Sequence, residues 1–177
     1  THAGIPFVIH SGVKFFEQAH IKDITAFLKV LFNPLDEISW MRLLRLLPGI
    51  GNNTAFKIFS VFLDQQAVKL TKSNESLNKL IPNKAFNSWI VLQECFQKML
   101  EDKISPSDMI RIIYQNFYKD ILFSSFENAL QRETDVRYLE EFAGNYDKLE
   151  TFLNELSLVG SSILSDYESE HNENDEM

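Results

Sequence analysis

The hydrophobic positions of this 177-residue chain repeat with helical spacing over most of its length. Between positions 21 and 32, the apolar residues fall three and four apart, as on one face of an amphipathic helix. Ser105 and Pro106 predict another helix start, because Ser suits an N-cap and Pro suits the first turn. Similar patterns predict helices over 38–47, 53–63, 87–101, 135–142 and from 147 onward. The sequence therefore predicts a mainly α, multi-helix globular fold.

The two ends of the chain do not follow this pattern. Residues 5–10 form a short apolar, β-branched run that predicts a β-strand, with Pro6 favouring an edge position. Such a strand has no partner in this chain, so we expect it to join a sheet located elsewhere. The last residues are polar and acidic, which predicts a disordered tail. We therefore divide the chain into a strand segment (1–14), a helical body (15–160) and an acidic tail (161–177).

Charge is unevenly distributed along the chain. The formal net charge is −8, but six of the 25 acidic residues lie between Ser165 and Met177, where there is no Lys or Arg. The segment from Arg42 to Lys72 contains five basic residues and only one acidic residue, Asp64. Such a segment can form a basic patch for a nucleic acid, or it can simply be a solvated helix surface.

The single cysteine, Cys95, lies in a helical pattern and is expected to be a buried, inert thiol in a reducing compartment.

One short stretch carries a candidate binding chemistry. Pro48-Gly49-Ile50-Gly51 joins two apolar, helix-patterned segments. Glycine at both positions permits a positive φ and close backbone approach, and Ile50 can fill the gap between the helices. The N–H groups at the start of the second helix are then free to hold an anion. This pattern favours a helix-hairpin-helix that binds a nucleic-acid phosphate, and the alternative is a hairpin used only for packing.

The sequence offers no catalytic constellation. It has no phosphate-binding P-loop, no paired acids suited to two metal ions and no nucleophile elbow. Its four histidines are scattered, which does not predict a metal site. No apolar run has membrane-spanning length. The aromatic residues Phe56, Phe59 and Phe62 have helical spacing and are expected in the core rather than in a base-stacking platform.

Several motifs resemble those of one family, in the same order along the chain. Gly12-x-x-Phe15-Phe16-Glu17, followed by Ile21-Lys22-Asp23, resembles the start of the 2B subdomain in UvrD/Rep/PcrA-type superfamily 1 DNA helicases. Further resemblances are Asn33-Pro34-Leu35-Asp36-Glu37, Pro48-Gly49-Ile50-Gly51 with Thr54, Arg132-x-x-Asp135-Val136, and the apolar pattern from Tyr146 to Leu158. Two positions depart from the family: His20 replaces a usual glutamate and Ser11 a frequent glycine.

This resemblance implies a part of a larger enzyme. The parent would bind ATP and Mg²⁺ in motor domains 1A and 2A and move 3′ to 5′ on DNA, in the bacterial cytoplasm near the nucleoid. The 2B subdomain would be an insertion in 2A that rotates, contacts duplex DNA and regulates unwinding. Residues 1–14 and the tail would then lead from and to 2A. The chain itself would hold no cofactor, metal or catalytic residue, and its partners would be duplex DNA, the single-strand/duplex junction and domains 1A, 1B and 2A, with no membrane.

The candidate site residues have two origins. The resemblance implies contact with the DNA backbone through Gly49, Ile50, Gly51 and Thr54. Charge and position add Lys57, Arg42 and Arg45 to this DNA-binding set. Phe15, Phe16 and Lys22 are assigned to the 2A–2B junction, with the alternative that Phe15 and Phe16 are simple core residues.

Two other classes of function stay open. An α-helical protein-interaction module would use the Phe-rich surface and the acidic tail to meet a partner protein, without binding DNA. A stand-alone helix-hairpin-helix glycosylase would need a catalytic residue after the hairpin, and Asp64 is the nearest candidate.

Overall fold

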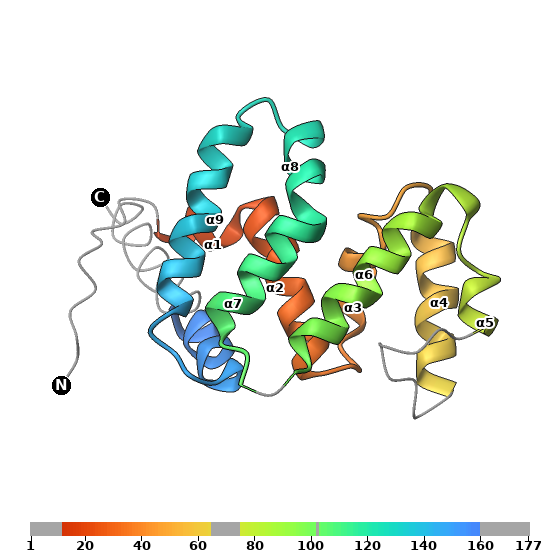
Figure 1. Ribbon diagram of the computed structural model, residues 1–177, viewed down its shortest axis with the longest axis horizontal. Helices are drawn as coiled ribbons and strands as arrows, with labels where there is room; N and C mark the ends of the chain where they lie inside the picture. Colours follow the sequence, from red (N-terminus) through yellow and green to blue (C-terminus); the bar gives the residue numbers. More distant parts are fainter. Residues whose placement is uncertain (1–11, 65–74, 102, 160–177) are drawn as a thin grey trace, which may run out of the picture.

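The computed structural model describes residues 12–64, 75–101 and 103–159 (Figure 1). The strand predicted over 5–10 and the tail predicted over 161–177 lie outside these residues. Within the described ranges the chain is mainly helical and contains no strand. The prediction of a mainly α, multi-helix globular fold is confirmed.

The described helices include every helix that the sequence predicted, in the same order along the chain. Their bounds are α1 Gly12–Glu17, α2 Ala19–Phe32, α3 Glu37–Leu44, α4 Asn52–Asp64, α5 Glu75–Asn78, α6 Phe86–Met99, α7 Pro106–Ile113, α8 Lys119–Ser125 and α9 Ala129–Ala143. Of these, α1, α5 and α8 are additional to the predicted helices. A 3₁₀ turn (η1, Asn83–Ala85) precedes α6, a π-helical turn (η2, Tyr114–Tyr118) joins α7 to α8, and a last helix covers 149–159. Because α1 begins at Gly12, residues 12–14 are helical although the sequence grouped them with the strand segment.

Side-chain caps fix the helix starts that the sequence predicted. The Ser39 N–H donates to Asp36 Oδ1 at 3.0 Å before α3, and the Asp108 N–H donates to Ser105 Oγ at 3.1 Å before α7. The predicted end of α3 at position 47 is wrong, since this helix stops at Leu44. The N–H groups of Leu46 and Leu47 bond three residues back, so the chain tightens into a 3₁₀-type turn before the hairpin.

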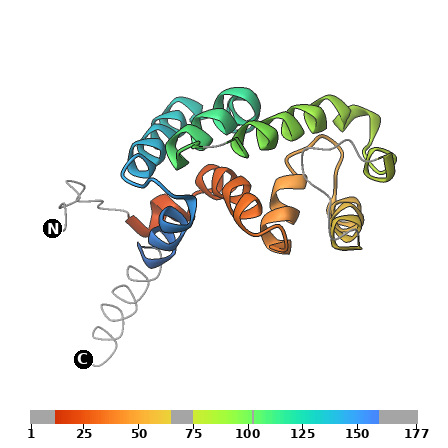
Figure 2. The ribbon, with the colours of Figure 1, turned by 60° about the horizontal axis from the view of Figure 1, so that its bottom comes forward.

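The helices form two layers (Figure 2). One layer contains α1 to α4 with the helix over 149–159, and the other contains α6 to α9. Helix α2 packs against α3 within its own layer and against α7 and α9 of the other layer. It is therefore the most deeply buried helix, and residues 23–28 along it are all buried.

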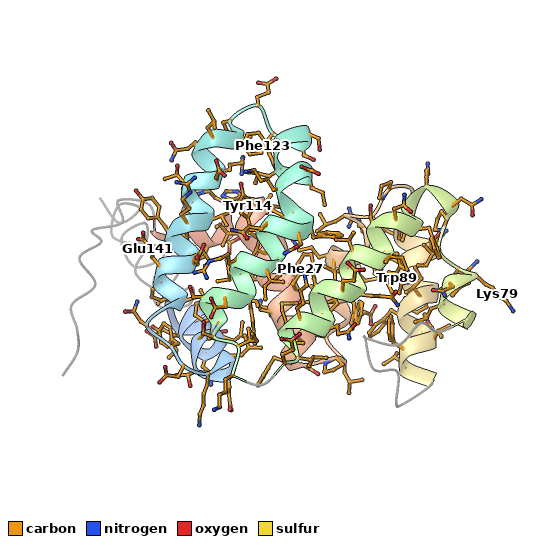
Figure 3. The ribbon with its side chains drawn as sticks, in the orientation of Figure 1. Phe27, Lys79, Trp89, Tyr114, Phe123 and Glu141 are labelled. Atoms are coloured by element: carbon orange, nitrogen blue, oxygen red, sulfur yellow. The ribbon has the colours of Figure 1, made fainter. Side chains whose placement is uncertain are left out.

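A chain of aromatic rings runs through the middle of this arrangement. Phe27 lies near the centre of the molecule (Figure 3), with its ring centroid 5.3 Å from Phe117 and 6.1 Å from Phe96. Trp40 extends this row of rings: its ring centroid lies 6.3 Å from that of Phe96, and it is stacked on Phe62 at 4.5 Å. These contacts connect η2, α2, α6, α3 and α4, so they hold the hairpin helices on the rest of the body.

A second aromatic cluster joins the first and last described helices. Phe142 of α9 lies 6.3 Å from Phe16 of α1 and 6.0 Å from Phe152 in the helix over 149–159. Both ends of the described body therefore pack around one side chain, on the opposite side of the molecule from α4 (Figures 1 and 2).

Candidate nucleic-acid interface

The turn between α3 and α4 has the features of a type II β-turn. The Ile50 N–H donates to the Leu47 carbonyl at 3.2 Å, which closes a four-residue turn with Pro48 and Gly49 in the middle. Gly49 has a φ of +76°, the left-handed conformation that this turn requires at its third position. The Pro-Gly pair is therefore explained by the geometry of the turn.

Ile50 and Gly51 have separate roles after this turn. Ile50 is 5% exposed and belongs to the hydrophobic core, in keeping with the prediction that it fills the gap between the helices. The Gly51 carbonyl accepts the Ala55 N–H at 2.9 Å, so Gly51 occupies the N-cap position of α4. Gly49 alone among the described glycines has a positive φ, and a Cβ added to Gly51 would meet no atom within 4 Å. Of the two positions at which glycine permits a positive φ, only Gly49 adopts one.

The N-terminus of α4 presents free backbone donors. Within the described residues, no acceptor pairs with the N–H groups of Asn52, Asn53 or Thr54. Asn52 and Asn53 are exposed and Thr54 is half-buried. The 13-residue helix α4 also places the positive end of its dipole here. This end of α4 can therefore accept an anion through backbone groups alone.

The cations predicted around the hairpin divide into two groups. Arg45 and Lys57 are exposed and form no ion pair with any described carboxylate. Arg42, in contrast, donates through Nε to Asp23 Oδ1 at 2.6 Å and through Nη2 to the Ala19 carbonyl at 3.1 Å. Its guanidinium is thus used in holding α3 against α2, so a DNA contact by Arg42 would compete with these bonds.

Sequence reasoning missed one cation at the hairpin. Lys84 of η1 lies across the turn, because a Cβ added to Gly49 would come within 2.0 Å of Lys84 Cε. No local pattern pointed to this residue, since it belongs to a different segment and reaches the hairpin only through the fold.

The predicted aromatic stripe of α4 is only partly in the core. Phe59 is buried and Phe62 is half-buried against Trp40. The prediction for Phe56 is wrong: it is 52% exposed. The buried stripe of α4 includes Ala55, Ile58 and Phe59, and Phe56 lies to one side of it, on the open surface next to Lys57.

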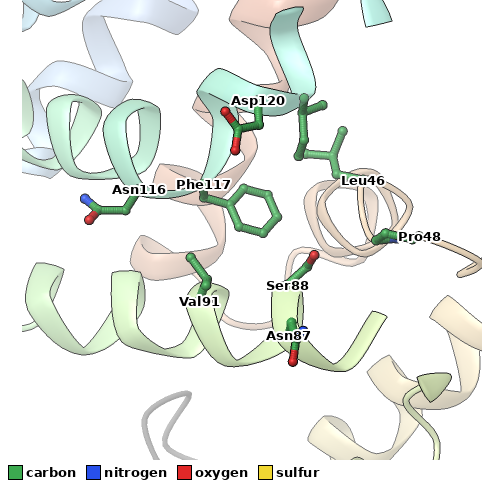
Figure 4. A pocket seen from close by; sticks show the side chains of 9 residues that line it. Leu46, Pro48, Asn87, Ser88, Val91, Asn116, Phe117 and Asp120 are labelled. Carbon is green, nitrogen blue, oxygen red and sulfur yellow. The ribbon is translucent and has the colours of Figure 1, made fainter. Parts of the chain in front are cut away.

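A hollow of about 250 Å³ lies beside the turn (Figure 4). It is lined by Leu46 and Pro48 on one side and by residues of α6, η2 and α8 on the others, among them Ser88, Phe117 and Asp120. No residue from 51 to 57 lines it. The hollow is therefore separate from the free N–H groups of α4.

The residues predicted for the 2A–2B junction lie at the opposite end of the body. Phe15 and Phe16 are half-buried, in a T-shaped contact at 5.0 Å, and both pack against the core. Lys22 pairs with the carboxylate of Glu17. Both phenylalanines thus belong to the packing of α1, and a junction role for them and for Lys22 stays a prediction.

His20, which stands where the family usually has glutamate, is fully buried between two charged groups of α9. Arg132 Nη1 lies 2.6 Å from His20 Nδ1, and His20 Nε2 lies 3.1 Å from Asp135 Oδ2. A neutral ring satisfies both contacts if Nδ1 accepts from Arg132 and Nε2–H donates to Asp135. Burial and the Arg132 charge lower the pKa of His20, against the opposing effects of Asp135 and Asp23. We therefore assign the neutral form.

Asp23 extends this polar network to two more elements. The Tyr118 hydroxyl donates to Asp23 Oδ2 at 2.5 Å, and Arg42 occupies the other carboxylate oxygen. Burial and the Asp23 charge raise the pKa of Tyr118, which keeps its hydroxyl protonated as a donor. Asp23 therefore ties α2 to both α3 and η2.

Cys95 is buried as predicted, and burial raises the pKa of its thiol to about 11, which keeps it unreactive. The described residues contain no cluster of three His, Cys, Asp or Glu side chains that could hold a metal ion. Among them, too, no helix has the length and apolar character needed to cross a membrane.

These features define a helical domain with the α3–α4 hairpin at one end, where the first N–H groups of α4 have no described acceptor. Comparison with known proteins gives its family: the chain belongs to the UvrD-like helicase C-terminal domain family, whose model matches residues 1–176. This match favours the helicase interpretation over a glycosylase or an unrelated interaction module.

Curated relatives carry helicase names. The chain is 29% identical over 159 residues to a probable DNA helicase II homolog of Mycoplasma capricolum, covering 84% of this chain and 20% of the relative. It is 26% identical over 178 residues to the ATP-dependent DNA helicase PcrA of Staphylococcus epidermidis, covering 89% and 23%. For PcrA of Staphylococcus aureus the identity is 21% over 184 residues, covering 94% and 25%. The chain spans about a fifth to a quarter of these relatives. No solved structure matches it significantly.

The two glycines of the hairpin should respond differently to the same substitution. Gly49→Ser places a side chain at a positive φ and should cost about 1–2 kcal/mol of unfolding free energy. Gly51→Ser enters open space at an N-cap and should change stability by only a few tenths of a kcal/mol. Urea denaturation followed by circular dichroism measures both. Equal losses in the two variants would contradict the assigned turn.

The buried histidine should make stability depend on pH. Its pKa is lowered in the folded state, whereas in the unfolded chain it is about 6.5. Below pH 6.5 the unfolded state therefore binds an extra proton, and stability falls as the pH decreases. Between pH 7.5 and 5.5, wild type should lose up to about 1.4 kcal/mol more than His20→Gln, whose amide also offers a donor and an acceptor. Parallel losses in both proteins would contradict the neutral assignment.

Proposed function

We propose that this chain is the 2B subdomain of an ATP-dependent 3′-to-5′ DNA helicase, and that its α3–α4 hairpin holds the backbone of duplex DNA. The observation that carries this proposal is the free N-terminus of α4, where three N–H groups have no described acceptor and Gly51 leaves open space beside them. The family match and the helicase names of the relatives support the same conclusion.

The chemistry of the hairpin suits a DNA phosphate. The phosphate oxygens would accept hydrogen bonds from the N–H groups of residues 52–54 and from the Thr54 hydroxyl. Arg45 and Lys57 would add attraction from positions where no described carboxylate neutralises them. These contacts read no base, so binding would be independent of sequence and sensitive to salt.

The arrangement of the body supports a regulatory role. The first and last described helices lie together around Phe142, and the hairpin lies on the opposite side (Figure 1). If this end joins domain 2A, as the family resemblance implies, a small rotation there produces a large displacement of the hairpin. By such a rotation the subdomain would bind or release the duplex ahead of the motor domains and so regulate unwinding.

The ATP-driven step belongs to the part of the parent outside this chain. Neither the sequence nor the described side chains fit an ATP·Mg²⁺ site, because there is no P-loop and no metal-binding cluster among the described residues. We therefore assign ATP and Mg²⁺ to domains 1A and 2A, and we expect no ATPase activity from the chain alone.

Fluorescence anisotropy with a labelled duplex tests the proposal. The 177-residue chain should bind two duplexes of unrelated sequence equally and weakly. If two or three phosphates are neutralised, the affinity should fall about ten- to fortyfold between about 50 and 200 mM salt. A tailed duplex in the same assay shows whether the single-strand/duplex junction adds affinity.

The Gly51→Ser variant separates DNA binding from folding. The serine hydroxyl can accept a hydrogen bond from one of the free N–H groups of α4, so the free energy of unfolding should stay close to that of wild type. That N–H group is then no longer available to a phosphate, so duplex affinity should fall roughly tenfold, as expected for the loss of one charge-assisted hydrogen bond. If wild type shows no binding at low salt with its helical circular dichroism spectrum intact, the proposal fails. A nuclease-insensitive pull-down would then favour the protein-interaction module.

A further inference from the structure

The side chain of Lys84 occupies the space above the hairpin turn. A Cβ built on Gly49 would lie 2.0 Å from Lys84 Cε and 2.9 Å from Lys84 Nζ. The lysine therefore passes directly over a glycine whose lack of a side chain makes room for it. Figure 1 shows the same proximity of elements, with the start of α6 beside the α3–α4 turn.

We propose that Lys84 is a phosphate-binding residue of the hairpin, supplied by a segment outside the helix-hairpin-helix pattern. This inference rests on the proposed function, in which the hairpin holds duplex DNA. It adds a residue that neither the family motif nor the local charge pattern of the hairpin contains.

The fold holds the backbone of Lys84 in place while leaving its side chain exposed. Ile81 and Ala85 on either side are buried, and the Ala85 N–H donates to the Pro82 carbonyl at 2.8 Å. This 3₁₀ turn is therefore fixed to the core at both ends. Lys84 is exposed and points away from that core, across Gly49. Since the backbone is already ordered, only the side chain loses freedom when it binds a phosphate.

The charge of Lys84 is available for a ligand. No described carboxylate forms an ion pair with Lys84, whereas Arg42 is paired with Asp23. Lys84 therefore replaces Arg42, which the sequence predicted as the third cation of the hairpin beside Arg45 and Lys57. A flexible ammonium group above the turn would bind a phosphate as a point charge, without selecting a base.

The salt dependence of duplex binding tests this role. Lys84→Gln should weaken binding roughly three- to tenfold at about 50 mM salt, equally for unrelated sequences. The plot of log affinity against log salt should become less steep by about 0.9, as expected for one lost phosphate contact. Lys98→Gln is the matched control: Lys98 is also exposed and without an ion-pair partner among the described residues, but it lies at the other end of α6. This control should keep the wild-type slope, and Lys84→Arg should retain it too.

The outcomes separate this inference from the proposed function. If Lys84→Gln matches Lys98→Gln while Gly51→Ser still weakens binding, the hairpin holds DNA without Lys84 and the inference is wrong. If wild type binds no duplex at low salt, both fail. A decrease in slope for Lys84→Gln alone, with an unchanged urea midpoint, supports the inference.

Discussion

The left-handed backbone conformation of Gly49 is the constraint on which the hairpin depends. It closes the turn from Leu47 to Ile50, and the turn places Ile50 in the core. With Ile50 anchored, α4 starts at a fixed angle and its first N–H groups face outward. The missing side chain at Gly49 also leaves the space that Lys84 crosses. One backbone torsion therefore sets the orientation of a helix and the position of a cation.

The rest of the body supports this geometry by two kinds of packing. Aromatic rings from Phe62 to Phe117 connect the hairpin helices to the centre of the molecule through dispersion and hydrophobic burial. Buried polar groups around His20 and Asp23 then fix how α2, α3, η2 and α9 meet. Such networks are costly when incomplete, so they favour one arrangement of the helices. In the proposed function, a body held in one arrangement would carry a rotation at one end to the hairpin at the other.

The sequence predicted those features that depend on local signals. The N-cap Ser105 marked a helix start, and Pro48-Gly49 marked the turn, because these residues act on their own neighbours. It could not predict which cation would be free. Arg42 is paired with Asp23 and Lys84 reaches Gly49 only through tertiary packing. Helical spacing also failed for Phe56, since the periodicity does not fix how wide a stripe the neighbouring helix covers.

The central claim is that the start of α4 holds the DNA backbone, and amide NMR tests it most directly. In a titration of the ¹⁵N-labelled chain with a short duplex, the largest shift changes should fall on the N–H groups of residues 51–54, with smaller ones near Lys57 and Lys84. The signals of α9 and of residues 149–159 should stay in place. Changes concentrated at that opposite end, with residues 51–54 unmoved under saturating duplex, would contradict the account.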